Sequence, residues 1–189
     1  GEEGNDALFG RDGDDTIIGG GGNDRTYGGP GDDFIGDVSG SNRHYGGDGL
    51  DVIFGGYEFD YSNGGADDDR IYDLQSEASG AANVLYGGSG NDFSRGGAGS
   101  DHAYGGVGDD DIDAGDGENK VYGQDGNDVL VGGDDADVIS GGDGDDEVKG
   151  MLGDDRLSGG AGNDGVSGGE GNDVVKAAMM TCRVIVETT

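Results

Sequence analysis

The chain has 189 residues, a formal net charge of −32 and 48 glycines, and only 31% of its residues are hydrophobic. So little apolar content with so much negative charge excludes a conventional oily core and is typical of a chain that is disordered without a partner. The charge also argues against nucleic acid as a ligand. No apolar run is long enough to span a bilayer.

A nine-residue motif, Gly-Gly-x-Gly-x-Asp-x-apolar-x, recurs nineteen times between residues 1 and 176. It is clearest in residues 159–167 (GGAGNDGVS) and 168–176 (GGEGNDVVK). The period holds through Tyr72, is interrupted by a five-residue insertion at 73–77, and then resumes. A constant period predicts a stacked repeat fold in which each unit contacts only its neighbours.

The sixth position of the motif carries aspartate in all repeats but three, where Asn42, Asn83 and Asn119 stand. Aspartates in glycine-rich turns offer hard oxygen ligands and the turn carbonyls offer more, a mixture that suits calcium. The predicted metal ligands are Asp6, Asp15, Asp24, Asp33, Asp51, Asp60, Asp69, Asp92, Asp101, Asp110, Asp128, Asp137, Asp146, Asp155, Asp164 and Asp173.

The eighth position is expected to point inward, because x-apolar-x forms a short strand with one inward and two outward side chains. Thr26, His44, Ser62, Ser94 and Ala103 interrupt the otherwise aliphatic series and predict soft places in the interior. For His44 three interpretations are open: a locally polar core, a register shift that turns the side chain outward, or a transition-metal site.

Over residues 1–176 these motifs resemble the RTX (repeats-in-toxin) family. The resemblance implies an all-β fold, a right-handed parallel β-roll (a β-solenoid) with two nonapeptide repeats per coil and Ca²⁺ held in the turns. One ion in each gap between stacked turns would make up to about 17 ions. The resemblance also implies a secreted bacterial protein, extracellular or at the cell surface, that leaves by type I secretion.

Calcium is expected to drive folding, because one aliphatic side chain per repeat cannot offset the conformational entropy of nine ordered residues. The chain would then fold on calcium binding after export. The lone Cys182 cannot form an internal disulfide. Residues 177–189 are predicted to form a C-terminal cap or tail over the last strands.

Many of the outward-facing positions in the odd-numbered repeats carry aromatic or basic residues, which are expected to lie on one face of the roll. Rings stack on sugars and cations pair with carboxylates, so this face suits an acidic polysaccharide. The alternative is that tyrosine ladders simply stabilise the sheet. The candidate glycan-binding residues are Arg25, Tyr27, Arg43, Tyr45, Tyr86, His102, Tyr104, Lys120 and Tyr122.

Catalytic signals are weak. The G-x-S-x-G match at residues 165–169 crosses a repeat boundary, and the chain has no P-loop lysine motif. We therefore expect no enzymatic activity of this chain. It would serve as an adhesion module, or as the accessory domain of a secreted enzyme (protease, lipase or alginate epimerase) with an upstream domain in the same parent chain.

Overall fold

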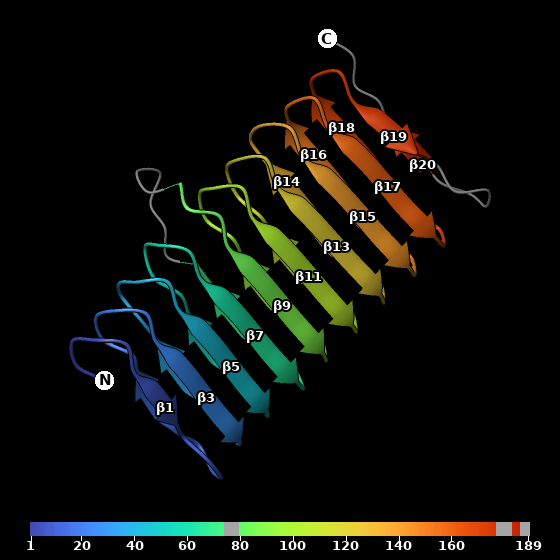
Figure 1. Cartoon of the computed structure of the whole chain (residues 1–189). Coiled ribbons are helices and arrows are strands. Elements are labelled where there is room, and N and C mark those ends of the chain that lie inside the picture. The colour runs from blue at the N-terminus through green and yellow to red at the C-terminus, as the bar shows by residue number, and fades with distance from the viewer. Residues whose placement is uncertain (74–79, 177–182, 186–189) are drawn as a thin grey trace.

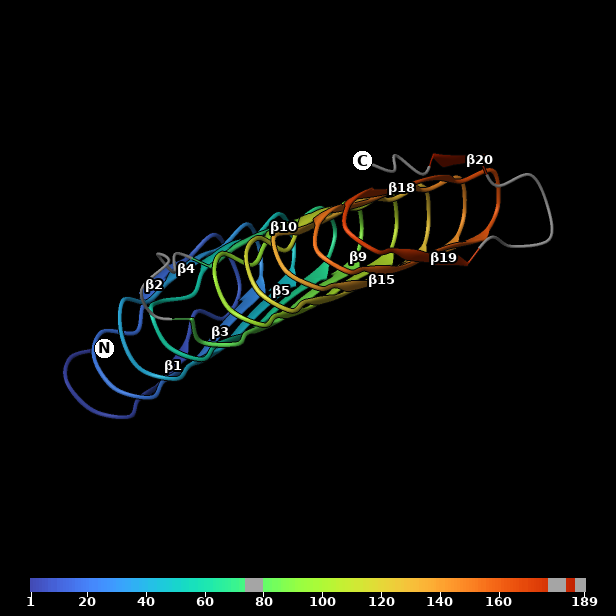
Figure 2. The same cartoon turned by 90° about the horizontal axis from the view of Figure 1, so that it is seen from above.

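The computed structural model describes residues 1–73, 80–176 and 183–185. Within these residues the chain forms two parallel ten-stranded sheets and no helix. Figure 1 shows the strands stacked along one axis from the N-terminal to the C-terminal end, and Figure 2 shows the turns that join the two sheets. The predicted all-β parallel roll is confirmed.

Strands of the odd-numbered repeats form one sheet, the odd sheet, and strands of the even-numbered repeats form the other, the even sheet. The odd sheet contains β1 (Ala7–Phe9), β3 (Arg25–Pro30), β5 (Arg43–Asp48), β7 (Tyr61–Ala66), β9 (Val84–Ser89), β11 (His102–Val107), β13 (Lys120–Asp125), β15 (Val138–Asp143), β17 (Arg156–Ala161) and β19 (Val174–Lys176). The even sheet contains β2 (Thr16–Ile18), β4 (Phe34–Gly36), β6 (Val52–Phe54), β8 (Arg70–Tyr72), β10 (Phe93–Arg95), β12 (Asp111–Asp113), β14 (Val129–Gly133), β16 (Glu147–Leu152), β18 (Gly165–Glu170) and β20 (Arg183–Ile185).

Neighbouring strands of one sheet are one coil apart. Thr26 pairs with His44, a separation of 18 residues, so each coil contains two repeats.

The separation rises to 23 residues in the coil that carries the insertion. Asp73 occupies the first position of its turn, because its N–H donates to the Arg95 carbonyl as the Gly55 N–H donates to the Tyr72 carbonyl. The extra residues follow it, and residues 74–79 lie outside the described ones.

Most strands of the odd sheet are longer than the expected three residues. β3 continues from Arg25 through Gly28 and Gly29 to Pro30, and Gly29 pairs with Gly47 of the next coil. Gly29 has a φ of 122°, which a Cβ would disfavour. Glycines at the second and fourth positions thus provide the left-handed backbone that the turn requires.

The eighth position points inward throughout the roll. Ile35, Ile53 and Ile71 are fully buried, and so are the polar Thr26 and His44. His44 therefore stays in register, and the interpretation in which it turns outward is wrong. The Thr26 Oγ1 lies 2.8 Å from His44 Nδ1. Burial lowers the pKa of His44 to about 4, although the nearby Asp24 charge opposes the shift. The core is therefore locally polar around Thr26 and His44, and the His44 imidazole is neutral at pH 7.

Part of the predicted cap or tail extends the even sheet. In β20, Val184 pairs with Val166 of β18, so the strand continues the nonapeptide spacing. Cys182 lies outside the described residues. None of the described segments is a helix of the length and hydrophobicity needed to cross a membrane.

Candidate metal centres

The sixth-position residues form two columns, one along each edge of the roll, in the turns that precede the strands. We call the column of the even-numbered repeats the even edge; it contains Asp15, Asp33, Asp51, Asp69, Asp92, Asp110, Asp128, Asp146 and Asp164. The column of the odd-numbered repeats is the odd edge; it contains Asp6, Asp24, Asn42, Asp60, Asn83, Asp101, Asn119, Asp137, Asp155 and Asp173. Within each column every residue is buried except at the ends, where Asp6, Asp15 and Asp173 are half-buried.

From the second coil onward, one side-chain oxygen of each sixth-position residue accepts a backbone N–H of the preceding coil. The Asp92 N–H donates to Asp110 Oδ1 at 2.8 Å, and the Asp110 N–H donates to Asp128 Oδ1 at 2.9 Å. An amide oxygen serves equally well, since the Asp24 N–H donates to Asn42 Oδ1 at 2.9 Å. This ladder holds the side chains in place and leaves the second oxygen of each aspartate for another role.

That second oxygen is buried and unpaired. In every predicted ligand except Asp6 and Asp173, which lie in the end coils, Oδ2 has no hydrogen-bond partner among the described residues. A buried carboxylate oxygen without a partner is costly unless it is protonated or coordinates a cation. A cation bound beside either column would therefore stabilise these unpaired oxygens.

The first-position glycine leaves open the space beside the unpaired oxygen. A Cβ on Gly10 would lie 2.6 Å from Asp15 Oδ2 and 2.7 Å from the carbonyl oxygen of Gly28 in the next coil. At Gly105 the carbonyl oxygen of Gly123 would be 2.8 Å away, and Asp110 Oδ2 would be closer still. A side-chain oxygen and a carbonyl oxygen thus converge on a space that only glycine leaves free.

The donor set fits calcium. Among the described residues, no group of three or more His, Cys, Asp or Glu side chains could hold a metal ion by itself. An ion in a gap between coils would therefore take carboxylate oxygen from the column and its remaining ligands from backbone carbonyls. Calcium accepts such all-oxygen sets of flexible geometry, whereas zinc prefers nitrogen and sulfur.

Burial shifts the protonation of these carboxylates. It raises the pKa of Asp69 to about 8, and like charges from Asp51 and Asp92 add to the effect while the Asp51 N–H opposes it. The pKa of Asp110 rises to about 7 for the same main reason, as do those of Asp101 and Asp137. Without a cation, these side chains hold protons near neutral pH.

A second ladder along the outer rim was not predicted from the sequence. Here the fifth-position side chain accepts from the following coil: the Asp109 N–H donates to Asn91 Oδ1 at 2.8 Å, and the Asn127 N–H to Asp109 Oδ1 at 2.7 Å. The two ladders run in opposite directions, so the turn that carries Asn91 and Asp92 accepts one N–H from the coil before it and one from the coil after it. The recurring Asn or Asp at the fifth position was the available signal.

The predicted glycan-binding residues lie together on the outer face of the odd sheet. Arg25 pairs with Arg43, and His102 with Lys120, in register across neighbouring strands. In the described part of the chain, both ion pairs belong to the even sheet, Arg95–Asp113 and Lys149–Glu147. Seven rings form one series on the odd sheet, with 4.5–5.6 Å between neighbouring centroids; they are stacked except at Tyr61, which is tilted by 44° against both of its neighbours: Phe9, Tyr27, Tyr45, Tyr61, Tyr86, Tyr104 and Tyr122.

Two parallel sheets joined by turns that stack oxygen donors define a β-roll of the cation-binding class. The chain matches the family model described as the RTX calcium-binding nonapeptide repeat (4 copies) over residues 1–35, 45–72, 77–103, 86–121, 104–139, 122–157 and 140–175. It therefore belongs to the RTX calcium-binding repeat family. A search of curated proteins found no match.

Proposed function

We propose that this chain is a folding module of a secreted protein that becomes ordered when calcium binds after export. The observation that carries the proposal is the two columns of buried, unpaired Oδ2 atoms. In a chain of net charge −32, these oxygens repel one another, and none of them forms an ion pair within the described residues. Calcium in the gaps supplies that charge, and its binding energy becomes folding energy.

The difference in calcium concentration across the cell envelope would keep the chain unfolded before export and fold it afterwards. RTX repeats are typical of secreted bacterial proteins. Extracellular calcium modules bind with dissociation constants on the order of 10⁻⁴–10⁻³ M, far above the calcium available inside a cell. The chain would stay extended and exportable through a type I channel inside the cell and fold outside. We further propose that it is non-catalytic and accessory to an upstream domain of its parent protein.

A calcium titration tests this function. Far-ultraviolet circular dichroism and small-angle X-ray scattering are recorded as calcium is added to the chelated chain. We expect β-signal and compaction to appear together with calcium and to disappear with excess chelator. Magnesium should be far less effective, because it retains its water shell and demands octahedral geometry. A chain that remains compact and β-rich in chelator would contradict the proposal.

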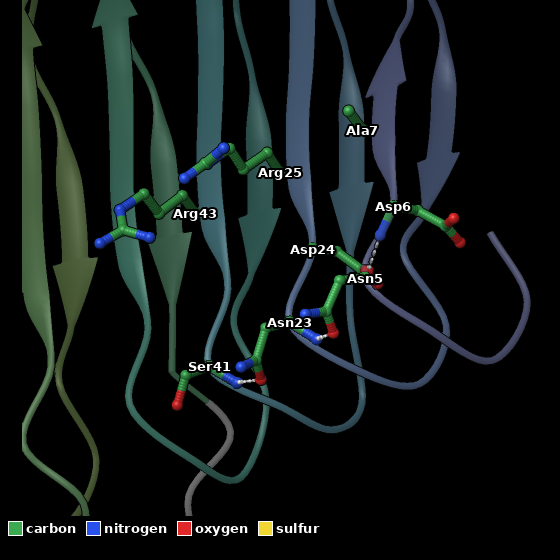
Figure 3. Close-up of a pocket in the computed structure, with 8 residues that line it drawn as sticks. All are labelled: Asn5, Asp6, Ala7, Asn23, Asp24, Arg25, Ser41 and Arg43. Carbon is green, nitrogen blue, oxygen red and sulfur yellow. Dashed lines mark hydrogen bonds between the residues drawn. The ribbon is translucent and has the colours of Figure 1, made fainter.

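The odd sheet supports a second candidate function, binding of an acidic polysaccharide. Its six tyrosine rings are half-buried and Phe9 is exposed, while Arg25, Arg43 and Lys120 are exposed and form no ion pair within the described residues. Arg25 and Arg43 lie on neighbouring strands and line a polar hollow (Figure 3). The hollow has a volume of about 360 Å³. The hollow is lined by Asn5, Asp6, Ala7, Asn23, Asp24, Arg25, Ser41 and Arg43.

Matched double substitutions on the two sheets test this second function. Arg43→Ala with Tyr45→Ala removes one cation and one ring from the odd sheet; Arg70→Ala with Tyr72→Ala removes the same pair at equivalent positions of the even sheet. Binding to polygalacturonate in saturating calcium should weaken about tenfold in the first variant only. Equal binding by both variants and the unaltered chain would leave the rings with a purely structural role.

A further inference from the structure

The first and sixth positions of the repeat change together. Wherever the sixth position is aspartate, the first is glycine. The three repeats with asparagine at the sixth position instead begin with a side chain: Asp37 with Asn42, Asp73 with Asn83, and Ala114 with Asn119. In the regular repeats a Cβ at the first position would lie about 3 Å or less from the Oδ2 of the sixth-position aspartate. Asparagine has the same shape as aspartate but carries no charge and offers an N–H donor where aspartate has its second oxygen. A first-position side chain therefore occurs only where the sixth-position residue is a neutral amide.

Two of these exchanges replace the cation with a hydrogen bond. The Asn119 amide donates to the carbonyl oxygens of Gly115 and Gly132, at 3.1 and 3.5 Å. Gly132 O occupies the position that faces the unpaired carboxylate in other gaps. The Asn83 amide donates to Asp73 Oδ2 of its own turn. In both turns, an N–H group meets the oxygen that would otherwise be left without a partner.

The third exchange leaves a carboxylate oxygen unpaired. Asp37 is 4% exposed, and its Oδ1 accepts the Val38 N–H at 2.7 Å. The Asn42 amide donates to Gly40 O at 3.0 Å, and Asp37 Oδ2 has no partner in the described chain. The carboxylate of this repeat has in effect moved from the sixth position to the first, and thereby into the gap on the other side of the coil.

In that gap Asp37 meets a second unpaired carboxylate. Asp24, 1% exposed, places its Oδ2 2.8 Å from the point where a Cβ on Gly19 would stand, and Asp37 Oδ2 lies closer to the same point. At the equivalent Gly28 this place is taken by the carbonyl oxygen of Gly46, at 2.6 Å. Burial and the Asp24 charge raise the pKa of Asp37, although backbone N–H groups oppose the shift.

We propose that the gap between β3 and β5 is a cation site of its own kind, formed by Asp24, Asp37 and the space left by Gly19. It presents two carboxylates where the regular gaps present one, and the neighbouring gap at Asn42, like those at Asn83 and Asn119, has no sixth-position carboxylate. The proposal rests on the calcium-dependent folding proposed above. Because calcium affinity rises with the charge of the ligands, this site should release its ion last and hold the N-terminal coils together.

Calcium release from the full chain tests the site. The calcium-saturated protein is mixed with an excess of a chromophoric chelator in a stopped-flow instrument. In the unaltered chain, we expect one ion per chain to leave about tenfold more slowly than the others. Asp37→Asn and Asp37→Gly should both abolish the slow phase, and the glycine variant restores the residue of the regular repeat, so its folding is not compromised. Asp143→Asn, which removes the same charge from an exposed side chain, should leave it unchanged.

The outcomes separate the site from the proposed function. A slow phase that survives both Asp37 substitutions would overturn the two-carboxylate site while leaving calcium-dependent folding intact. Loss of the slow phase in Asp143→Asn would also overturn the site, because it would show a general charge effect. An unaltered chain that binds no calcium would overturn both proposals.

Discussion

Each coil has an even side, made of its even-edge turn and even-sheet strand, and an odd side, made of its odd-edge turn and odd-sheet strand. The even side follows the repeat more regularly than the odd side. The even edge has aspartate at every sixth position and glycine at every first, and Ser94 alone interrupts the aliphatic residues of its strands. The odd side carries the three asparagines and the polar interior column of Thr26, His44 and Ser62. Because each coil contributes a turn to both edges, the regular even side can maintain the spacing while the odd side accepts exceptions.

The largest expected contrast is in the interior. Ile53→Ala on the even side should lower the free energy of unfolding by about 2–5 kcal/mol, because it leaves a cavity beside fully buried neighbours. Ser62→Ala on the odd side removes little volume and should change it by less than about 1 kcal/mol. Urea unfolding in saturating calcium measures both. Equal losses would show that the two interior columns support the roll alike.

A second contrast concerns the carboxylates of the even edge. Asp128→Asn with Asp146→Asn keeps the Oδ1 acceptors and removes two unpaired Oδ2 atoms. We expect the calcium concentration at half-folding, followed by circular dichroism, to rise about tenfold. Asp125→Asn with Asp143→Asn removes the same charge from exposed positions and serves as the control. A shift of the same size in the control would reduce the effect to net charge.

The calcium concentration at half-folding should change several-fold with pH. Burial raises the pKa of Asp69 to about 8 and of Asp110 to about 7, so the metal-free roll favours their protonated forms. That stabilisation is present below the unfolded value of 3.8 and is lost as the pH rises through about 7 to 8. Calcium must displace these protons, so less calcium should be needed at pH 8 than at pH 6. Titrations at a series of pH values measure this, and an unchanged midpoint would contradict the burial of these carboxylates.

The smallest effect should be equal on the two edges. Asp67 on the even side and Asp135 on the odd side hold left-handed φ angles of 76° and 72° at fourth positions where glycine is usual. Replacing either with glycine should relieve strain and raise the free energy of unfolding by about 1 kcal/mol. Thermal unfolding in saturating calcium provides the measurement. A loss of stability in either variant would mean that the aspartate stabilises its turn.

The nine-residue period was sufficient to place most residues. It assigned Ile53 to the interior and Asp110 to a turn, because in a stacked repeat the position within the period decides the environment. It did not indicate that one oxygen of Asp110 is used by the Asp92 N–H, or that Asn91 accepts a bond in the opposite direction. Those bonds depend on how far each turn is offset from its neighbours, which the sequence period does not specify.

The amino-acid sequence by itself determined the stacked repeats, the inward column and the acidic turns, since each follows from periodicity and residue chemistry, while the parallel roll with two repeats per coil came from the resemblance of the motif to the RTX family. Only the tertiary structure decided which oxygen remains unpaired, why the first glycine must lack a Cβ, and where the Asp37 carboxylate points. These depend on distances of about 3 Å between atoms a full coil apart, which arise only when the coils are stacked.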